Sequence, residues 1–156
     1  MAGYYNNPTA TEKATDADGW LHTGDLACCR EDGNYRIVGR CKELINRGGE
    51  KIYPPEVEEF LHHHPDVAEA AVAGLPDAKY GEIVAAWIVP RDGAELTPDA
   101  IRAYCQGKIT HYKIPEYVAI VESLPRTATY KVKKHILCQQ AIAELGLGSI
   151  AGIETA

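Results

Sequence analysis

Alternation of apolar and polar positions is clearest in the middle and last thirds of the chain. Residues 66–75 (DVAEAAVAGL) alternate enough for a strand, and residues 81–90 (GEIVAAWIVP) show a strong strand pattern. Residues 117–122 (YVAIVE) predict a further strand. We expect the first two of these strands to form the centre of one sheet.

Three segments show helical rather than alternating spacing, and they are residues 55–64, 98–107 and 134–145. In the first, Val57, Phe60 and Leu61 share one face. In the second, Thr97 is suited to cap the helix and Pro98 to occupy its first position. The third is amphipathic, with expected inward positions at Ile136, Leu137, Ala141 and Leu145.

The first forty residues contain many turn formers and little apolar periodicity. Residues 26–30 and 34–40 read as two strands joined by a turn at residues 31–34, and this hairpin has no core of its own. At the other end, the small residues from Gly146 onward indicate a loose tail. The order of elements predicts an α+β fold, in which a small mixed β-sheet is flanked by helices and preceded by a β-hairpin.

Composition narrows the class of protein. The chain has 156 residues, of which 46% are hydrophobic and 24% charged, as in a soluble globular protein. Its formal net charge of −6 argues against nonspecific nucleic-acid binding, which needs a basic surface. No apolar run approaches the roughly 20 residues of a membrane span, and the N-terminus lacks the apolar core of a signal peptide. We therefore expect a cytoplasmic protein in which any anion site is local.

The five cysteines are Cys28, Cys29, Cys41, Cys105 and Cys138. Their number is odd and no CxxC spacing occurs, which indicates reduced, partly buried thiols in a reducing compartment. Cys28 and Cys29 are neighbours in a predicted strand, so their side chains point to opposite faces. The run of His62, His63 and His64 suits a solvated helix C-terminus. We expect no metal site.

Residues 39–58 (GRCKELINRGGEKIYPPEVE) are the first candidate for chemistry. Gly48 and Gly49 permit a positive φ or the close approach of another molecule, because they have no Cβ. Positive charge surrounds them, from Arg40, Lys42, Arg47 and Lys51. The segment suits an anion, although an ordinary hairpin that leads into an ordinary helix has the same pattern.

Residues 125–134 (PRTATYKVKK) are the second candidate. Four cations fall within nine residues of a chain that is acidic as a whole, and they are Arg126, Lys131, Lys133 and Lys134. Clustered cations of this kind are usually a solvated face. Composition alone therefore leaves a catalytic cation and a solvated surface both open.

Both segments resemble motifs of the adenylate-forming superfamily, which comprises AMP-forming acyl-CoA and aryl-CoA synthetases and their relatives. The first matches the hinge pattern GR-x-K/D-x-x-I-x-x-G-G-x-K-I-x-P-x-E-V-E at nearly every fixed position, and the second is similar to P-x-T-x-x-G-K-V/I-x-K/R. By this resemblance Lys131 is the catalytic cation of acyl adenylation. Tyr130 stands where the pattern has glycine, and if that position needs a positive φ, tyrosine costs on the order of 1 kcal/mol or more.

The same resemblance implies roles for further residues. In HTGD, residues 22–25, Asp25 would accept hydrogen bonds from both ribose hydroxyls of ATP or AMP, and Arg40 would contact the ribose or a phosphate. The alternatives are a turn aspartate and a surface salt bridge. Lys42 would be the hinge about which a C-terminal domain rotates. Gly48 and Gly49 would flank the pantetheine of CoA in the second domain position.

A fourth likeness lies in HYKIP, residues 111–115, which is similar to a segment of aryl-acid and medium-chain acyl ligases. It adds Lys113 as a candidate for binding a phosphate of CoA. The resemblance then implies three regions: residues 1–41 as the C-terminal end of a large adenylating domain, residues 42–145 as the mobile C-terminal domain, and residues 146–156 as a flexible tail.

The function implied is that of the C-terminal part of an ATP-dependent, AMP-forming acyl/aryl-CoA ligase, whose substrates are a carboxylic acid, ATP and CoA. The phosphate loop, the acyl pocket and the magnesium-associated glutamate of the family's large domain are missing from the chain. Mg²⁺ is therefore expected only in the intact enzyme, and the chain is expected to be a fragment that is inactive alone. The alternatives are a noncatalytic module that binds CoA, a nucleotide or a carrier protein, and a purely structural interaction domain.

Overall fold

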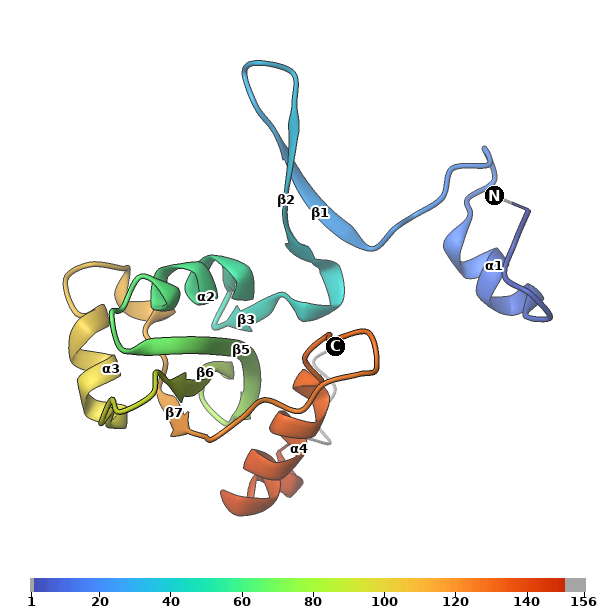
Figure 1. The fold of residues 1–156 in the computed structure, drawn as a ribbon. Coiled ribbons are helices and arrows are strands. Elements are labelled where there is room, and N and C mark those ends of the chain that lie inside the picture. The colour runs from blue at the N-terminus through green and yellow to red at the C-terminus, as the bar shows by residue number, and fades with distance from the viewer. Residues whose placement is uncertain (1, 151–156) are drawn as a thin grey trace. The chain divides into compact units, whose positions relative to one another are not determined.

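The computed structural model describes residues 2–150 (Figure 1). They belong to two compact units, Met1–Lys42 and Glu43–Ala156. The first unit begins with helix α1 (Pro8–Ala14), which was not among the predicted elements. Its signal is present in the sequence, because Asn7 is a capping residue and Pro8 suits a first helical position. The Asn7 side chain accepts a hydrogen bond from Ala10 N–H at 3.0 Å.

The predicted hairpin is confirmed in the first unit. Strands β1 (Asp25–Cys29) and β2 (Tyr35–Arg40) pair antiparallel, with a bulge after Leu26. None of the described side chains of this unit is buried in an apolar core, and Tyr35 and Ile37 of β2 are largely exposed. The hairpin is therefore held by its backbone ladder and by polar side-chain contacts, without an apolar core, as expected from the sequence.

The second unit is built around a five-stranded sheet, whose strands are β3 (Ile45–Arg47), β4 (Glu50–Ile52), β5 (Val67–Asp77), β6 (Gly81–Pro90) and β7 (Tyr117–Ile120). The order along the sheet is β4-β3-β6-β5. The expected central pair is confirmed, since β5 and β6 pair along nearly their whole length. On the other edge of β6, β3 pairs only through Arg47 and Gly81, and β7 lies parallel to residues 85–88. The sheet is mixed, as predicted.

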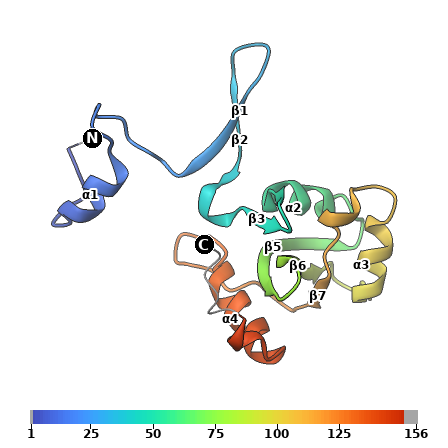
Figure 2. The same cartoon turned by 180° about the vertical axis from the view of Figure 1, so that it is seen from behind.

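Both faces of this sheet are covered by helices, α2 (Pro54–His62), α3 (Pro98–Cys105) and α4 (Lys134–Glu144) (Figures 1 and 2). Val84, Ala86 and Ile88 of β6 pack in one apolar cluster with α2 and α3. Ala85 and Trp87 pack in a second cluster with α4. Successive residues of β6 thus point into different clusters, which explains an apolar run with little alternation. The α+β class with helices on a small mixed sheet is confirmed.

Helix α4 ends slightly earlier than predicted, and one inward position was wrong. Leu137 and Ala141 are buried and Ile136 is half-buried, but Leu145 is 47% exposed. Leu145 lies beyond the last helical residue, and Gly146, with φ +68°, then turns the chain. The predicted helical spacing was correct, but Leu145 is exposed because the helix ends before it.

The remaining regular elements are 3₁₀ turns, η1 (Cys41–Glu43), η2 (His111–Lys113) and η3 (Leu147–Ser149). η3 lies in the region 146–156 that was expected to be a tail, and residues 151–156 of that region lie outside the described residues. Among residues 2–150, no helix has the length and the apolar content that a membrane span requires.

The five thiols are free and differ in burial. Cys28, Cys29 and Cys41 are exposed, whereas Cys138 is half-buried and Cys105 is buried. Burial raises the pKa of the Cys105 thiol to about 11 and raises the pKa of Cys138 in the same direction. Both thiols therefore stay protonated at neutral pH. No three His, Cys, Asp or Glu side chains are grouped to hold a metal ion within residues 2–150.

The cap of α3 provides a test of the fold. Thr97 Oγ1 accepts a hydrogen bond from Ala100 N–H at 3.2 Å, as the sequence predicted. We predict that Thr97→Ala lowers the free energy of unfolding by about 1 kcal/mol, whereas Thr97→Ser keeps the hydroxyl and most of the stability. Urea unfolding followed by circular dichroism measures both variants, and equal stability of the two would contradict the cap.

Candidate functional site

Asp25 and Arg40 lie at opposite ends of the hairpin sequence and face each other across its ladder. They are register partners, and Arg40 Nε lies 3.0 Å from Asp25 Oδ1. Asp25 N–H donates to the Thr23 hydroxyl at 3.1 Å, which fixes the start of β1. The Asp25 side chain is 29% exposed. A carboxylate has about four acceptor positions, so the contact with Arg40 leaves others for a ligand.

Lys42 is the last residue of the first unit and the middle residue of η1. It is exposed, and its ammonium has no ion pair with another residue of the described range 2–150. Its φ and ψ can therefore change without breaking a side-chain ion pair, which is the property that a hinge residue needs.

Gly48 and Gly49 form the two-residue turn between β3 and β4. Arg47 pairs with Glu50 across the turn, and the φ angles of the glycines are +59° and +95°. Positive φ at both central residues is the requirement of a type I′ hairpin turn. The glycine pair of the family motif thus forms the turn of an ordinary β-hairpin, so the two interpretations of the sequence describe one structure. A Cβ on Gly49 would meet no atom within 4 Å, so this side of the turn is open.

The backbone of this glycine turn is fixed from the sheet side. Gly48 N–H donates to the Tyr80 carbonyl at 2.8 Å, and Gly49 N–H donates to Asn46 Oδ1 at 3.1 Å. Asn46 is itself held, because its N–H donates to the Glu82 carboxylate at 2.7 Å. Both glycine donors are therefore used internally, and the turn presents a fixed backbone rather than free N–H groups.

Arg47, expected as part of the positive charge around the turn, has internal partners. Its guanidinium lies 4.1 Å from the centroid of the Tyr80 ring, and its Nε donates to Glu116 Oε1 at 3.0 Å. Its side chain is only 14% exposed. Lys79 lies near the same ring, and its hydrogen bond with the Tyr80 side chain lowers the pKa of Tyr80. Arg47 therefore supports the turn and is not available to an external anion.

Lys113 also has an internal partner. Its Nζ lies 2.5 Å from Glu56 Oε1 of α2, and its side chain is 19% exposed. With Phe60 and Ile109 it lines a cavity of about 280 Å³ beside α2. Glu56 uses one of the three donors of the Lys113 ammonium, and the side chain is mostly covered.

Lys131 lies on a hairpin turn whose arms meet at the bridge between Arg126 and Val132. Thr127 N–H donates to the Lys131 carbonyl at 2.9 Å, and Tyr130 N–H donates to the Thr127 carbonyl at 3.0 Å. This is a three-residue loop in which the last residue takes the left-handed conformation. Tyr130 occupies that position with φ +62°, which gives a physical reason for the glycine of the family pattern. A left-handed conformation costs a residue with a Cβ roughly 1–2 kcal/mol.

The cations around this lysine turn, residues 126–132, are not a uniform solvated face. Arg126 forms an ion pair with Glu69 of β5, and Lys134 Nζ lies 2.8 Å from Glu58 Oε1 of α2. Lys131 is exposed, and its ammonium has no ion pair among the residues that the structure describes. The structure thus singles out Lys131 as the available cation of the turn.

The supporting residues of both turns were missed by sequence reasoning. Glu116 lies 69 positions from Arg47, and Glu69 lies 57 positions from Arg126. Only the pairing of strands and the packing of helices bring such residues together. No local pattern in the sequence could have found them.

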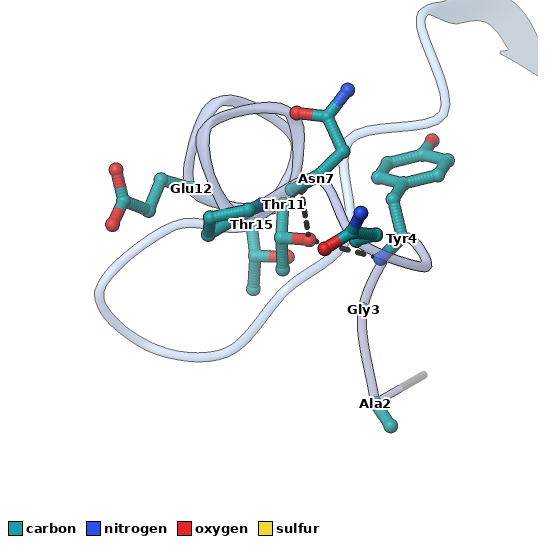
Figure 3. A pocket seen from close by; sticks show the side chains of 9 residues that line it. Ala2, Gly3, Tyr4, Asn7, Thr11, Glu12 and Thr15 are labelled. Carbon is teal, nitrogen blue, oxygen red and sulfur yellow. Dashed lines mark hydrogen bonds between the residues drawn. The ribbon is translucent and has the colours of Figure 1, made fainter.

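A larger hollow, of about 580 Å³, lies in the first unit at the start of α1 (Figure 3). Tyr4 N–H donates to Thr11 Oγ1 at 2.9 Å, and the Thr11 hydroxyl donates to the Asn7 carbonyl at 3.1 Å. These polar groups satisfy one another, and none of the predicted site residues lines the hollow.

The conformation of Tyr130 generates a prediction about stability. Tyr130→Gly relieves the left-handed strain, and Tyr130→Ala removes the ring but keeps the strain. We expect the glycine variant to be more stable than the alanine variant by about 1 kcal/mol in free energy of unfolding, measured by urea denaturation. Equal stability of the two variants would show that the left-handed conformation is not strained in solution.

The chain matches a known family over part of its length. Residues 56–131 match the model described as AMP-binding enzyme C-terminal domain. Among curated proteins, "Putative acyl-CoA synthetase YngI" of Bacillus subtilis (strain 168) is 51% identical over 149 residues, which are 96% of this chain and 27% of that protein. "Medium-chain acyl-CoA ligase ACSF2, mitochondrial" of Homo sapiens is 46% identical over 147 residues, which are 94% of this chain and 24% of that protein.

A solved structure gives the same result. ATP-bound MatB from Rhodopseudomonas palustris matches with a TM-score of 0.83 and 35% identity, over 89% of this chain and 28% of that one. The chain spans about a quarter of the length of the curated relatives it matches. The family match begins in α2 and ends at Lys131.

Proposed function

Because the chain belongs to the adenylate-forming superfamily and carries its AMP-binding enzyme C-terminal domain, we propose that it is the C-terminal part of an ATP-dependent, AMP-forming acyl- or aryl-CoA ligase. The observation that supports this most directly is Lys131. It is an exposed ammonium on a hairpin turn, without an ion pair among residues 2–150, at the position that matches the family's adenylating lysine.

The first half-reaction is carboxylate adenylation. A carboxylate oxygen attacks the α-phosphorus of ATP, the bond from that phosphorus to the bridging oxygen breaks, and pyrophosphate leaves. Two anions approach each other and charge builds on the phosphoryl oxygens, so the compact ammonium of Lys131 lowers the barrier. Asp25 accepts the ribose hydroxyls in this scheme, and Arg40 contacts the ribose or a phosphate.

The second half-reaction is thioester formation. The sulfur of CoA attacks the acyl carbonyl carbon, the thiol proton goes to solvent, the bond to AMP breaks, and AMP leaves. Gly48 and Gly49 lie along the pantetheine arm in this scheme, because a turn without Cβ atoms lets another chain approach its backbone. A rotation about Lys42 exchanges the lysine turn for the glycine turn between the two steps.

Three further assignments belong to this proposal. Lys113 contributes to binding a CoA phosphate through the ammonium donors that Glu56 does not use. Mg²⁺ finds no group of three candidate ligands within residues 2–150, so we assign no step to it. A cytoplasmic location is proposed from the composition, although the human relative is named as mitochondrial.

A reconstituted ligase tests the function. We define it as the human medium-chain acyl-CoA ligase in which this full chain replaces the matching 147-residue segment. Adenylation is measured by ATP–pyrophosphate exchange with a medium-chain fatty acid, and thioester formation is measured from preformed acyl-adenylate and CoA. Absence of both activities would contradict the proposal. Micromolar binding of CoA or ATP by the chain alone, measured by calorimetry, would then favour the noncatalytic module.

Lys131 and Gly49 should separate the two half-reactions. In the reconstituted ligase we expect Lys131→Ala to lower adenylation about 100-fold, with a much smaller effect on thioester formation. Gly49→Val should lower thioester formation much more than adenylation, because the added side chain obstructs the approach of the CoA thiol.

The controls match each change. Lys133→Met removes a neighbouring cation, and Gly93→Val introduces the same positive-φ strain in a different turn, since Gly93 has φ +77°. Equal loss of both half-reactions in the Lys131 and Gly49 variants would rule out this division of labour.

We predict that the Asp25 carboxylate contributes to the affinity for ATP. Asp25→Asn removes the charge and one acceptor that would meet the ribose hydroxyls, so the KM for ATP should rise about tenfold in the reconstituted ligase. Asp32→Asn, in the turn of the same hairpin, is the control and should leave this KM unchanged. A KM for ATP that does not respond to Asp25→Asn would assign Asp25 to the turn alone.

A further inference from the structure

The lysine turn is fixed to the sheet by a single forked side chain on its first arm. Arg126 Nη1 donates to the Tyr130 carbonyl at 2.8 Å, and Nη2 forms an ion pair with Glu69 Oε2 of β5. The planar guanidinium can hold both oxygens at once because its donors are arranged in a rigid fork. Arg126 thus connects the backbone beside Lys131 to a central strand.

The bonded carbonyl belongs to the peptide unit that joins Tyr130 to Lys131. The other polar group of this unit, Lys131 N–H, donates to Thr127 Oγ1 at 3.1 Å. A peptide unit is planar, so two bonds on opposite sides fix its orientation. That orientation sets the direction in which the Lys131 side chain leaves the backbone.

Tyr130 makes this anchoring necessary. A residue with a Cβ is strained at φ +62°, and the strain persists only where the surroundings hold the conformation. Tyr130 is 80% exposed, so its side chain gives little packing that could do this. Bonds within the turn restrain the Tyr130 N–H and the Lys131 N–H, and the carbonyl bond to Arg126 adds a contact that opposes relaxation of Tyr130 to a negative φ.

The second arm of the turn is bonded to the first arm and, through Lys134, to two further carboxylates. Lys133 N–H donates to the Pro125 carbonyl at 2.7 Å, and Lys134 Nζ lies 2.8 Å from Glu58 Oε1 and 3.5 Å from Glu43 Oε2. An ammonium at the first position of α4 is unfavourable beside the positive end of the helix dipole, and these two carboxylates offset it. The arms are therefore held at their bases, and Arg126 links the tip of the turn to strand β5.

We propose that Arg126, oriented by Glu69, is a positioning residue for adenylation, which holds the peptide between Tyr130 and Lys131 so that the Lys131 ammonium meets the reacting phosphate. This inference rests on the proposed function. It predicts an effect on the first half-reaction alone, because the glycine turn is supported by different residues, Tyr80 and Asn46.

The reconstituted ligase tests it through Arg126→Met, which keeps an apolar stem and removes the fork. A displaced catalytic group commonly costs up to about 100-fold, so we expect kcat for pyrophosphate exchange to fall at least about tenfold with little change in the KM for ATP. Thioester formation from preformed acyl-adenylate should stay within about twofold. Glu69→Gln is the milder second variant, and circular dichroism of each variant checks folding.

Two comparisons separate positioning from general stabilisation. Lys133→Met is the matched loss of a cation and should leave both half-reactions unchanged. Tyr130→Gly accepts the left-handed conformation without strain, so Arg126→Met should cost several-fold less adenylation in a Tyr130→Gly background than in the original chain. Arg126→Lys keeps the charge but not the fork and should recover only part of the loss.

Parallel loss of both half-reactions, or an Arg126→Met ligase as active as the Lys133→Met control, would overturn the positioning role. A penalty of the same size with and without Tyr130→Gly would overturn it as well. If the unmodified reconstituted ligase makes no acyl-adenylate, the proposed function fails and this inference fails with it. If Lys131→Ala separates the half-reactions and Arg126→Met does not, only the present inference fails.

Discussion

Strand β6 pairs on both edges and is buried on both faces, and its neighbours carry the supports of both candidate turns. β5, its longest partner, bears Glu69 near its start, and the turn after β5 bears Tyr80. Glu69 fixes the lysine turn through Arg126, whereas the Tyr80 carbonyl fixes Gly48. Nearly the full length of β5 separates these anchors, so each turn is attached to the same rigid strand at a different place.

Charge in the second unit is distributed by the same attachments. Arg47, Lys113, Arg126 and Lys134 are each neutralised by a glutamate of another element, and these glutamates are Glu116, Glu56, Glu69 and Glu58. Part of the acidic excess of the chain thus serves to hold its cations in place. The cation of the lysine turn that remains exposed without an ion pair among the described residues is Lys131, which is the one that the proposed chemistry needs.

Local patterns predicted the elements well because alternation, caps and turn residues act over a few positions. They found the hairpin, the strands β5 to β7 and the three helices of the second unit, and the glycine pair does adopt positive φ. The family resemblance supplied the condition under which Tyr130 is strained, a positive φ at the glycine position, and the structure meets it. Three features depend on contacts between distant segments and could not be predicted from the sequence. They are the strand order, the bond from Gly48 N–H to the Tyr80 carbonyl, and the two bonds of the Arg126 guanidinium. Leu145 was placed inside because the period of a helix does not reveal where it ends.

The sheet and the two turns are held by different forces. The sheet is stabilised by buried apolar side chains, whereas the lysine turn is fastened to β5 through an ion pair whose members are partly exposed, Arg126 at 34% and Glu69 at 41%. Dissolved salt screens charges at such positions, but it does not weaken apolar burial in the same way. Rising ionic strength would therefore loosen the placement of the lysine turn before it affected the fold, so the geometry around Lys131 and the stability of the sheet would respond to different properties of the solvent.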